Sequence, residues 1–327
     1  MVNIDTIEEL IDFVKEKNEI IIPSQKVSMK VLKKFYDVIL INKNYKGKYS
    51  KQKKLIVKIN IIRKLMAWYD AKMSYCECND DTRRGKSQEA IIDLMNNKER
   101  YKKAYNLLDD DSKGIYILIL LFKITGNYEY IVKAVSGNQQ YFSDKIEWKE
   151  KENIIDCGAF IGDTLEAFVE RNIRLESYYL YELEDDNFSR LLQSCEKAKE
   201  RGVKVYPRQK GVHNESTTLY FEANADSSRL VDYKTDHSIQ VVALDEDVNG
   251  TVTFIKMDIE GSELEALQGA KNIIKRDKPT LAICLYHKQS DFWKIPLLIH
   301  EICPDYKKYW IEHYTCNYNE TVLYVSL

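Results

Sequence analysis

The chain has 327 residues, a formal net charge of −2 at pH 7, 44% hydrophobic and 31% charged residues, and only 12 glycines and 5 prolines. These proportions are typical of a folded globular protein, and they exclude a mainly disordered chain or a collagen-like repeat. The length allows about two domains, or one domain with a substantial extension.

The 7 cysteines are odd in number and scattered, mostly among apolar or helical-looking segments, which favours reduced thiols over a disulfide framework. The N-terminus carries acidic residues every few positions and lacks the basic start and apolar stretch of a signal peptide. The longest apolar run, residues 114–122, has about half of the ~20 residues that a membrane span needs, so we expect a buried helix there. The sequence thus predicts a cytoplasmic protein without a membrane span.

Residues 1–75 are basic, with 16 Lys and Arg against 8 Asp and Glu, and the excess centres between Lys26 and Lys64. Apolar residues recur in this region at helical spacing, which favours amphipathic helices whose lysines are solvated. A surface for nucleic acid or an acidic glycan is the alternative.

The chain changes character near residue 150. Residues 4–75 and 87–135 are dominated by helix-period patterns, and the polar, glycine-containing stretch at 77–86 between them predicts a connector. From residue 151, short β-branched and aromatic runs alternate with helical segments, which predicts βαβ units around a mostly parallel sheet. We therefore expect a helical N-terminal region, 1–150, and an α/β domain, 151–327.

The last two runs of the α/β domain, 309–311 and 322–325, predict a closing antiparallel hairpin. The other strands expected in this domain are 154–155, 178–181, 203–206, 253–255 and 278–285, and its expected helices are 165–169, 186–199 and 263–274.

A glycine turn follows the first expected strand, in the sequence Ile154-Ile155-Asp156-Cys157-Gly158-Ala159-Phe160-Ile161-Gly162-Asp163-Thr164. Glycines let the backbone approach a ligand closely, and the N-terminus of the following helix offers N–H groups. The spacing Gly-x-x-x-Gly after an acid disfavours a pyrophosphate-binding dinucleotide site. The carboxylate of Asp156 would repel a pyrophosphate but suits the cationic amino-acid end of S-adenosylmethionine. An ordinary tight turn between strand and helix is the alternative.

Two further groups of acidic residues follow expected strands. Glu182 comes after the second strand, about twenty residues beyond Gly162, where a carboxylate can accept hydrogen bonds from ribose hydroxyls. Asp258 and Glu260 come at the end of the strand at 253–255, and open α/β sheets bind ligands at that edge. We therefore expect cofactor binding at Glu182 and chemistry near Asp258.

Four segments together resemble the FkbM-type S-adenosylmethionine-dependent methyltransferases. They are the glycine turn at 154–164, Tyr181-Glu182, Val242-Ala243-Leu244-Asp245-Glu246 and Ile255-Lys256-Met257-Asp258-Ile259-Glu260-Gly261-Ser262-Glu263, the last being the most specific. The segments 107–113 and 140–142 also match the helical lead-in of many members, so the resemblance covers roughly 100–327. It implies a Rossmann-like class I methyltransferase fold, S-adenosylmethionine as cofactor, and O-methylation of a sugar or another small-molecule hydroxyl.

The resemblance also implies roles for single residues. Those expected to line the cofactor are Asp156, Gly158, Ala159, Phe160, Gly162, Asp163, Thr164, Glu182, Leu183, Gly211, Val212 and Asp258. Of these, Glu182 is expected to hold the ribose, Gly211 and Val212 to lie near the adenine, and Asp258 near the methyl group. Leu183 departs from the family, many members of which have proline at this position.

Methylation of a hydroxyl is aided by a base, since an alcohol is a poor nucleophile until it loses its proton. The candidates are Asp258, Glu260 and His287, the last at the end of the strand at 278–285 and with an ordinary pKa near neutrality. The same three residues offer an alternative, convergence on a divalent metal, but the sequence fixes no coordination geometry and we predict no metal site. A structural histidine is the other reading of His287.

The sequence thus predicts a methyltransferase of a sugar hydroxyl in a surface glycan or its precursor. Two alternatives stay open. One is a methyltransferase of a nucleic-acid or protein acceptor that uses the basic region between Lys26 and Lys64, although no Asn-Pro-Pro-aromatic signature of base N-methylation is present. The other is a catalytically idle binding module with the same fold. Residues 227–229 are expected to form a turn near the acceptor, where Arg229 either binds an acidic acceptor or pairs at the surface.

Overall fold

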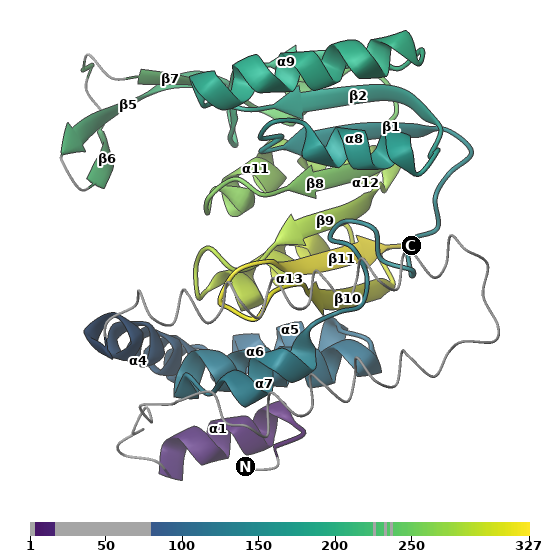
Figure 1. The fold of residues 1–327 in the computed structure, drawn as a ribbon. Coiled ribbons are helices and arrows are strands. Elements are labelled where there is room, and N and C mark those ends of the chain that lie inside the picture. Colours follow the sequence, from purple (N-terminus) through teal and green to yellow (C-terminus); the bar gives the residue numbers. More distant parts are fainter. Residues whose placement is uncertain (1–3, 17–79, 225–226, 232–233, 236–237) are drawn as a thin grey trace. The chain divides into compact units, whose positions relative to one another are not determined.

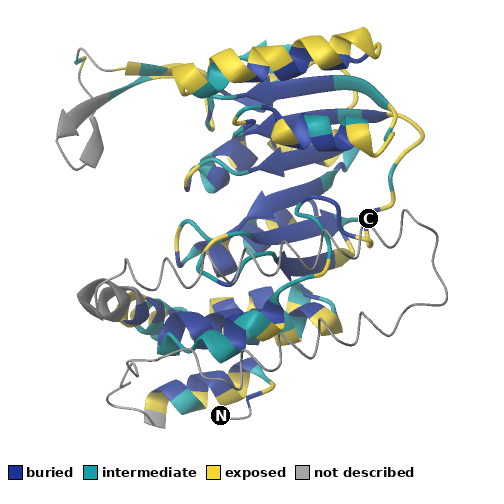
Figure 2. Ribbon diagram, in the orientation of Figure 1, coloured by how far each residue is buried: buried dark blue, intermediate teal, exposed yellow. Residues whose placement is uncertain are grey.

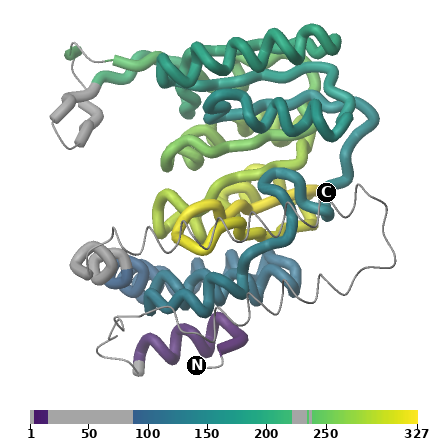
Figure 3. Tube along the Cα trace, viewed as in Figure 1, coloured from purple at the N-terminus to yellow at the C-terminus, as the bar shows by residue number. Residues whose placement is uncertain are grey.

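The computed structural model describes residues 4–16, 80–224, 227–231, 234–235 and 238–327. The chain divides into two units, one of Met1–Asp144 with Trp310–Val322 and one of Lys145–Tyr309 with Leu323–Leu327 (Figures 1 and 3). The helices expected between residues 17 and 75, with the basic centre at Lys26–Lys64, lie outside the described residues. The division of the chain at residue 150 stays a prediction.

The first unit is helical. Its described helices are α1 (Ile7–Glu16), α4 (Asp80–Asn96), α5 (Lys98–Leu107), α6 (Asp110–Thr125) and α7 (Tyr128–Ala134). The buried helix expected at residues 114–122 lies within α6, most of whose second half is buried (Figure 2). The side chain of Asp109 caps α6 by accepting from the Ser112 N–H at 2.8 Å, and Gly126, in the left-handed conformation, ends it.

The helix α4 begins inside the stretch that the sequence predicts as a connector. Residues 80–86 are helical, so only 77–79 of the predicted stretch precede α4, and these lie outside the described residues. The prediction relied on the polar composition and on Gly85, but a single glycine costs a helix only about 1 kcal/mol relative to alanine. Polarity alone therefore did not mark a break in the helix.

A mainly parallel sheet of seven strands has the order β10-β11-β9-β8-β1-β2-β3, and β1, β2, β3, β8 and β9 lie wholly in the second unit (Figure 1). The strands are β1 (Glu152–Cys157), β2 (Leu175–Tyr181), β3 (Lys204–Arg208), β8 (Phe254–Met257), β9 (Thr280–Cys284), β10 (Lys308–His313) and β11 (Thr321–Ser326). The order changes direction between β1 and β8, and open α/β sheets bind ligands at such a switch point. The predicted Rossmann-like fold is thereby confirmed.

The predicted hairpin is formed by β10 and β11, through which the boundary between the two units passes. The Lys307 N–H donates to the Ser326 carbonyl at 3.1 Å, and the Tyr314 N–H donates to the Glu320 carbonyl at 3.0 Å. These two bonds join opposite ends of the strands, so the pairing is antiparallel.

The central strands β1 and β8 are covered on both faces, which explains why nearly all of their residues are buried. Register places Ile155 opposite Ile255 and Cys157 opposite Met257, and all four are fully buried. The ring of Phe168, from helix α8 (Asp163–Glu170), lies 5.9 Å from that of Phe254. This packing fixes the strand ends from which the candidate site is built.

Helices flank the sheet, and two of them replace one expected helix. The segment expected as a helix at 263–274 forms α11 (Glu263–Gly269) and α12 (Lys271–Asp277), separated at Ala270. A Cβ on Gly269 would lie 2.0 Å from the carbonyl oxygen of His213, so α11 ends against the chain after β4 (Gly211–Val212). The remaining helices are α9 (Asp185–Glu200), α10 (Leu244–Asp247) and α13 (Asp291–Ile302).

A second sheet has the order β4-β7-β5-β6, with β5 (Thr217–Asn224), β6 (Ser227–Val231) and β7 (Ser238–Val242). The turn expected at residues 227–229 is instead the start of β6, which pairs antiparallel with β5. Pairing with β5 satisfies backbone groups that an isolated turn would leave to solvent. None of the described helices of either unit is long and apolar enough to cross a bilayer.

Candidate functional site

The glycine turn joins the end of β1 to α8 and lies against the end of β8. Gly158 has φ +77°, and a Cβ there would lie 1.9 Å from the carbonyl oxygen of Asp258. The N–H groups of Gly158 and Ala159 both donate to the Tyr181 carbonyl at 2.9 Å, which joins the turn to the end of β2. Only glycine combines this conformation with this close approach.

A buried ion pair between Lys256 and Asp156 contacts the same turn. The Lys256 Nζ lies 2.9 Å from Asp156 Oδ1 and donates to the Gly158 carbonyl at 2.5 Å. The Tyr178 hydroxyl donates to Asp156 Oδ2 at 3.1 Å. Burial opposes the ammonium form, but the carboxylates of Asp156 and Asp258 outweigh it and raise the pKa of Lys256. Lys256 therefore stays charged.

This arrangement bears on the expected role of Asp156. Its side chain has no exposed surface, and its carboxylate contacts Lys256 and Tyr178. Direct contact between Asp156 and the methionine end of a cofactor stays a prediction. The sequence reasoning missed the partner role of Lys256. The signal was available, since Lys256 is a charged residue inside an otherwise apolar strand.

Glu182 directly follows β2 and is held by backbone donors. One carboxylate oxygen accepts from the Phe160 N–H at 2.8 Å and the other from the Glu184 N–H at 2.9 Å. Each carboxylate oxygen has two lone pairs, so Glu182 can accept further hydrogen bonds. Phe160 lies in the left-handed region at φ +49° and is 49% exposed, and Leu183 is 39% exposed, so both present apolar surface beside Glu182.

Gly162 closes the turn and leads into α8. It has φ +85°, and a Cβ there would lie 2.7 Å from that of Ser194 on α9. Asp163 is exposed and Thr164 is buried in the first turn of α8, where N–H groups lack partners within the helix.

Gly211 and Val212 form the short strand β4 and pair with Val241 and Val242 of β7. Their expected place near an adenine ring stays a prediction, as does the contact of Asp163 and Thr164 with a cofactor.

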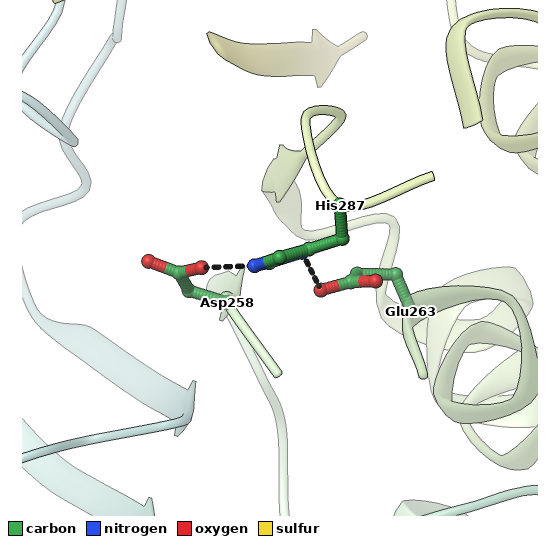
Figure 4. A group of neighbouring side chains, drawn as sticks. All are labelled: Asp258, Glu263 and His287. Atoms are coloured by element: carbon green, nitrogen blue, oxygen red, sulfur yellow. Dashed lines mark ion pairs between the residues drawn. The ribbon is translucent and has the colours of Figure 1, made fainter. Parts of the chain in front are cut away.

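Side chains from three elements meet at the end of β8, as Figure 4 shows for Asp258, Glu263 and His287. Asp258 follows β8, His287 follows β9, and Glu263 is the first residue of α11. The His287 Nε2 lies 3.4 Å from Asp258 Oδ1, and the Tyr286 hydroxyl donates to that same oxygen at 2.7 Å. Two predicted catalytic residues, distant in sequence, are thus brought together.

The third predicted catalytic residue, Glu260, lies at the outside of this group. Its Oε2 is 3.5 Å from His287 Nε2, but its side chain is 92% exposed. Glu263, which the sequence reasoning did not select, is 1% exposed and places Oε1 2.9 Å from His287 Nδ1. The sequence signals for Glu263 are its place at the end of the segment 255–263, the most specific part of the resemblance, and its position at the start of a helix.

Two side chains in this region, His287 and Asp291, have raised pKa values. Burial opposes the charged imidazole of His287, but Glu263, Asp258 and Glu260 together outweigh it and raise the pKa of His287 above its ordinary value. Asp291, at the start of α13, is 1% exposed, and burial raises its pKa to about 7 although the Lys288 N–H donates to it at 2.9 Å. Asp291 was also missed, since nothing in the sequence marks its burial.

The three residues of Figure 4 each place one ligand atom within 4.8 Å of the others, a spacing that a divalent cation would accept. The two imidazole nitrogens, however, face different carboxylates, Nδ1 towards Glu263 and Nε2 towards Asp258. Both ring nitrogens are buried, and neither makes a hydrogen bond of good geometry to these oxygens. The group is therefore an electrostatic one, and it suits either proton transfer at Nε2 or a shared divalent cation.

Residues 156–313 match the methyltransferase FkbM domain family. A crystal structure of the methyltransferase FkbM from Methylobacillus flagellatus KT is similar, with 26% sequence identity and a TM-score of 0.61 over 72% of this chain and 62% of that one. The chain therefore spans less than two thirds of that protein. No curated protein sequence matches.

Two other solved structures are much less similar. An rRNA methylase from Streptococcus thermophilus has 11% identity and a TM-score of 0.34, covering 62% of this chain and 95% of that one. The N-terminal domain of human METTL16 in complex with SAH has 15% identity and a TM-score of 0.31, covering 56% and 62%. Similarity this low carries no argument about function.

The family match contains residues 156–164 of the glycine turn, Glu182 and the group at the end of β8. The resemblance that the sequence predicts is confirmed, because residues 156–313 match the methyltransferase FkbM domain family.

Proposed function

We propose that this protein is an S-adenosylmethionine-dependent methyltransferase that transfers a methyl group to a hydroxyl oxygen. The observation that carries the proposal is the pair His287 and Asp258, which the fold places within 3.4 Å of each other at the switch edge of an FkbM-family domain. An O-methyltransferase needs a proton acceptor at this place, and a cofactor-binding module without activity does not.

The residues at the sheet edge suit this cofactor. Glu182 keeps lone pairs for the two ribose hydroxyls, and the side-chain-free Gly158 and Gly162 leave the backbone open to close approach. Asp258 follows β8 beside them and presents a carboxylate to a positively charged sulfonium. When bound, S-adenosylmethionine supplies a methyl group on that sulfonium, and its transfer leaves S-adenosylhomocysteine.

The protein's own residues act on the acceptor. The acceptor hydroxyl approaches His287 Nε2, which takes its proton as the oxygen forms the new bond to the methyl carbon. Asp258 lies 3.4 Å from the same nitrogen and stabilises the imidazolium that forms. Holding the hydroxyl in line with the methyl group supplies much of the remaining rate gain.

The finer assignment is a sugar hydroxyl in a surface glycan or its nucleotide-linked precursor, and it rests on the family resemblance. We place the reaction in the cytoplasm, which is supported by the buried free thiols of Cys157, Cys195 and Cys303. The described residues offer no observation that favours a nucleic-acid or protein acceptor over a sugar.

The test is transfer of a labelled methyl group from S-adenosylmethionine to a panel of nucleotide-linked sugars and oligosaccharides. The intact chain is compared with His287→Gln and with His300→Gln, an exposed histidine of α13. We expect His287→Gln to lose about 100-fold or more of kcat, as is typical for removal of a general base, and His300→Gln to match the intact chain. Equal activity of both variants would contradict the proposed base.

A further inference from the structure

The imidazole of His287 is held between two carboxylates of different character. Asp258 is 21% exposed and faces Nε2, whereas Glu263 is 1% exposed and faces Nδ1 (Figure 4). Both ring nitrogens are themselves buried and make no hydrogen bond of good geometry, so the charge of the carboxylate beside each nitrogen decides which of them keeps a proton.

Glu263 is fixed in place by the backbone around it. Its Oε1 accepts from the Ile259 N–H at 3.0 Å and from the Gly261 N–H at 3.4 Å, both in the turn between β8 and α11. Gly261 has φ +94°, which aims this turn back over the start of α11. The oxygen that lies 2.9 Å from His287 Nδ1 therefore has little freedom to move away.

A carboxylate fixed beside Nδ1 has a chemical consequence. A neutral imidazole carries one proton, and a buried anionic oxygen next to Nδ1 favours the form in which the proton sits there. The lone pair is then on Nε2. Free histidine in water prefers the opposite form, with the proton on Nε2, so the protein must impose this choice.

We propose that Glu263 is the positioning residue of this site: it holds the proton on Nδ1 of His287 and thereby leaves the Nε2 lone pair to accept the proton of the acceptor hydroxyl. This inference rests on the proposed function, because the lone pair matters only if His287 is the base. Glu263 itself does not touch the acceptor.

The groups facing His287 come from every element around it. They are Asp258 and Glu260 after β8, Glu263 on α11, and Asp291 on α13, and Lys288 is the neighbouring cation. The carboxylate of Glu263 also supports the raised pKa of His287, since it is the largest of the contributions that raise it. Loss of the Glu263 carboxylate therefore lowers the pKa of His287 and also removes the preference for a proton on Nδ1.

The first test reads the tautomer without any methyl transfer. Nitrogen-15 labelled intact chain is examined by long-range proton–nitrogen correlation NMR at a pH where His287 is neutral, and its signals are assigned by their loss in His287→Gln. The chain has 5 histidines, so the subtraction is tractable. We expect the pattern of a proton on Nδ1. A proton on Nε2 in the intact chain would overturn the proposal, whether or not the protein is a methyltransferase.

The second test measures function with a matched pair, Glu263→Gln and Glu301→Gln, the latter at an exposed position of α13. Glu263→Gln keeps an oxygen for the two backbone donors but removes the charge beside Nδ1. We expect it to lower kcat by about 10-fold or more, to move the acidic limb of the pH profile to lower pH, and to leave the Kd for S-adenosylhomocysteine unchanged. Glu301→Gln, at its exposed position, should keep kcat within about twofold.

The outcomes separate the two claims. If the NMR pattern is as expected but no acceptor is methylated, the proposed function fails while the tautomer assignment stands. If Glu263→Gln folds, binds S-adenosylhomocysteine and keeps full kcat with an unmoved pH profile, the positioning role is overturned. If a chelator abolishes the activity of the intact chain and a divalent metal restores it, the three side chains are metal ligands and the positioning role is overturned too.

Discussion

Gly158 lies directly against the backbone of Asp258, so that a Cβ on the glycine would come within 1.9 Å of the Asp258 carbonyl oxygen. Gly158 directly follows β1, and Asp258 directly follows β8, the strand that pairs with β1. The contact joins the turn expected to hold the cofactor to the residue expected to lie at the methyl group. The two halves of the candidate site are therefore one rigid arrangement.

Replacing Gly158 with alanine should damage this junction. Gly202→Ala is the control, because Gly202 has φ +83° but no atom within 4 Å of the place that a Cβ would take. In Gly202→Ala, the only cost is that alanine must adopt the left-handed conformation, which is worth about 1 kcal/mol or slightly more. Gly158→Ala has the same cost and in addition a clash with the backbone of Asp258. Denaturant unfolding should therefore show a larger loss for Gly158→Ala. Equal losses would mean that the close approach is unimportant.

Breaking the buried ion pair should be costly. Lys256→Met leaves the buried carboxylate of Asp156 without its cation and should lower the free energy of unfolding by about 3 to 5 kcal/mol. The control is Lys204→Met, whose exposed pair with Glu176, at 2.8 Å, should be worth at most about 1 kcal/mol. Chemical denaturation of both variants at neutral pH measures the difference, and similar losses would refute the structural role of Lys256.

Asp291 should make stability depend on pH. Its pKa is raised by burial from 3.8 to about 7 in the folded state, so the folded protein binds its proton more tightly than the unfolded chain does. Stability from this group is fully present below pH 3.8 and is lost as the pH rises through 7. Asp291→Asn keeps an acceptor for the Lys288 N–H, and its stability should fall less than that of the intact chain between pH 4.5 and 7.5, about the range over which the group titrates. If the free energies of unfolding of the intact chain and of Asp291→Asn change with pH in parallel, the pKa of Asp291 is not raised.

The rate of methyl transfer should also depend on pH. His287 accepts a proton only when neutral, and its pKa is raised above 6.5 because the surrounding carboxylates outweigh burial. Activity should therefore rise with pH through an apparent pKa above 6.5 and be lost below it. A rate profile measured at saturating cofactor tests this. A profile that is flat down to about pH 5.5 would exclude His287 as the base.

The sequence predicted the parts of the site that local patterns mark. The glycine turn after β1 and the acid after β2 follow from the spacing of strand, turn and helix, and both are found where expected. The helix break at Ala270 was missed, because it depends on the approach of Gly269 to His213, which are far apart in the chain.

The missed site residues share one physical cause. Lys256 was read as part of a motif, but its partner Asp156 lies far earlier in the chain, and strand pairing alone brings them together. Glu263 and His287 likewise meet only through the packing of α11 beside the end of β9. Burial and partner choice for charged groups are properties of the fold, and a single sequence does not display them.

The most direct test of the account is calorimetric titration of S-adenosylhomocysteine into the intact chain, into Glu182→Gln and into Asp186→Asn, an exposed acid in the first turn of α9. The account predicts one binding site on the intact chain, an unchanged Kd for Asp186→Asn, and a Kd raised by about tenfold or more for Glu182→Gln, since hydrogen bonds to a charged group are worth about 1.5 to 3 kcal/mol. Absence of binding to the folded intact chain would contradict the methyltransferase assignment.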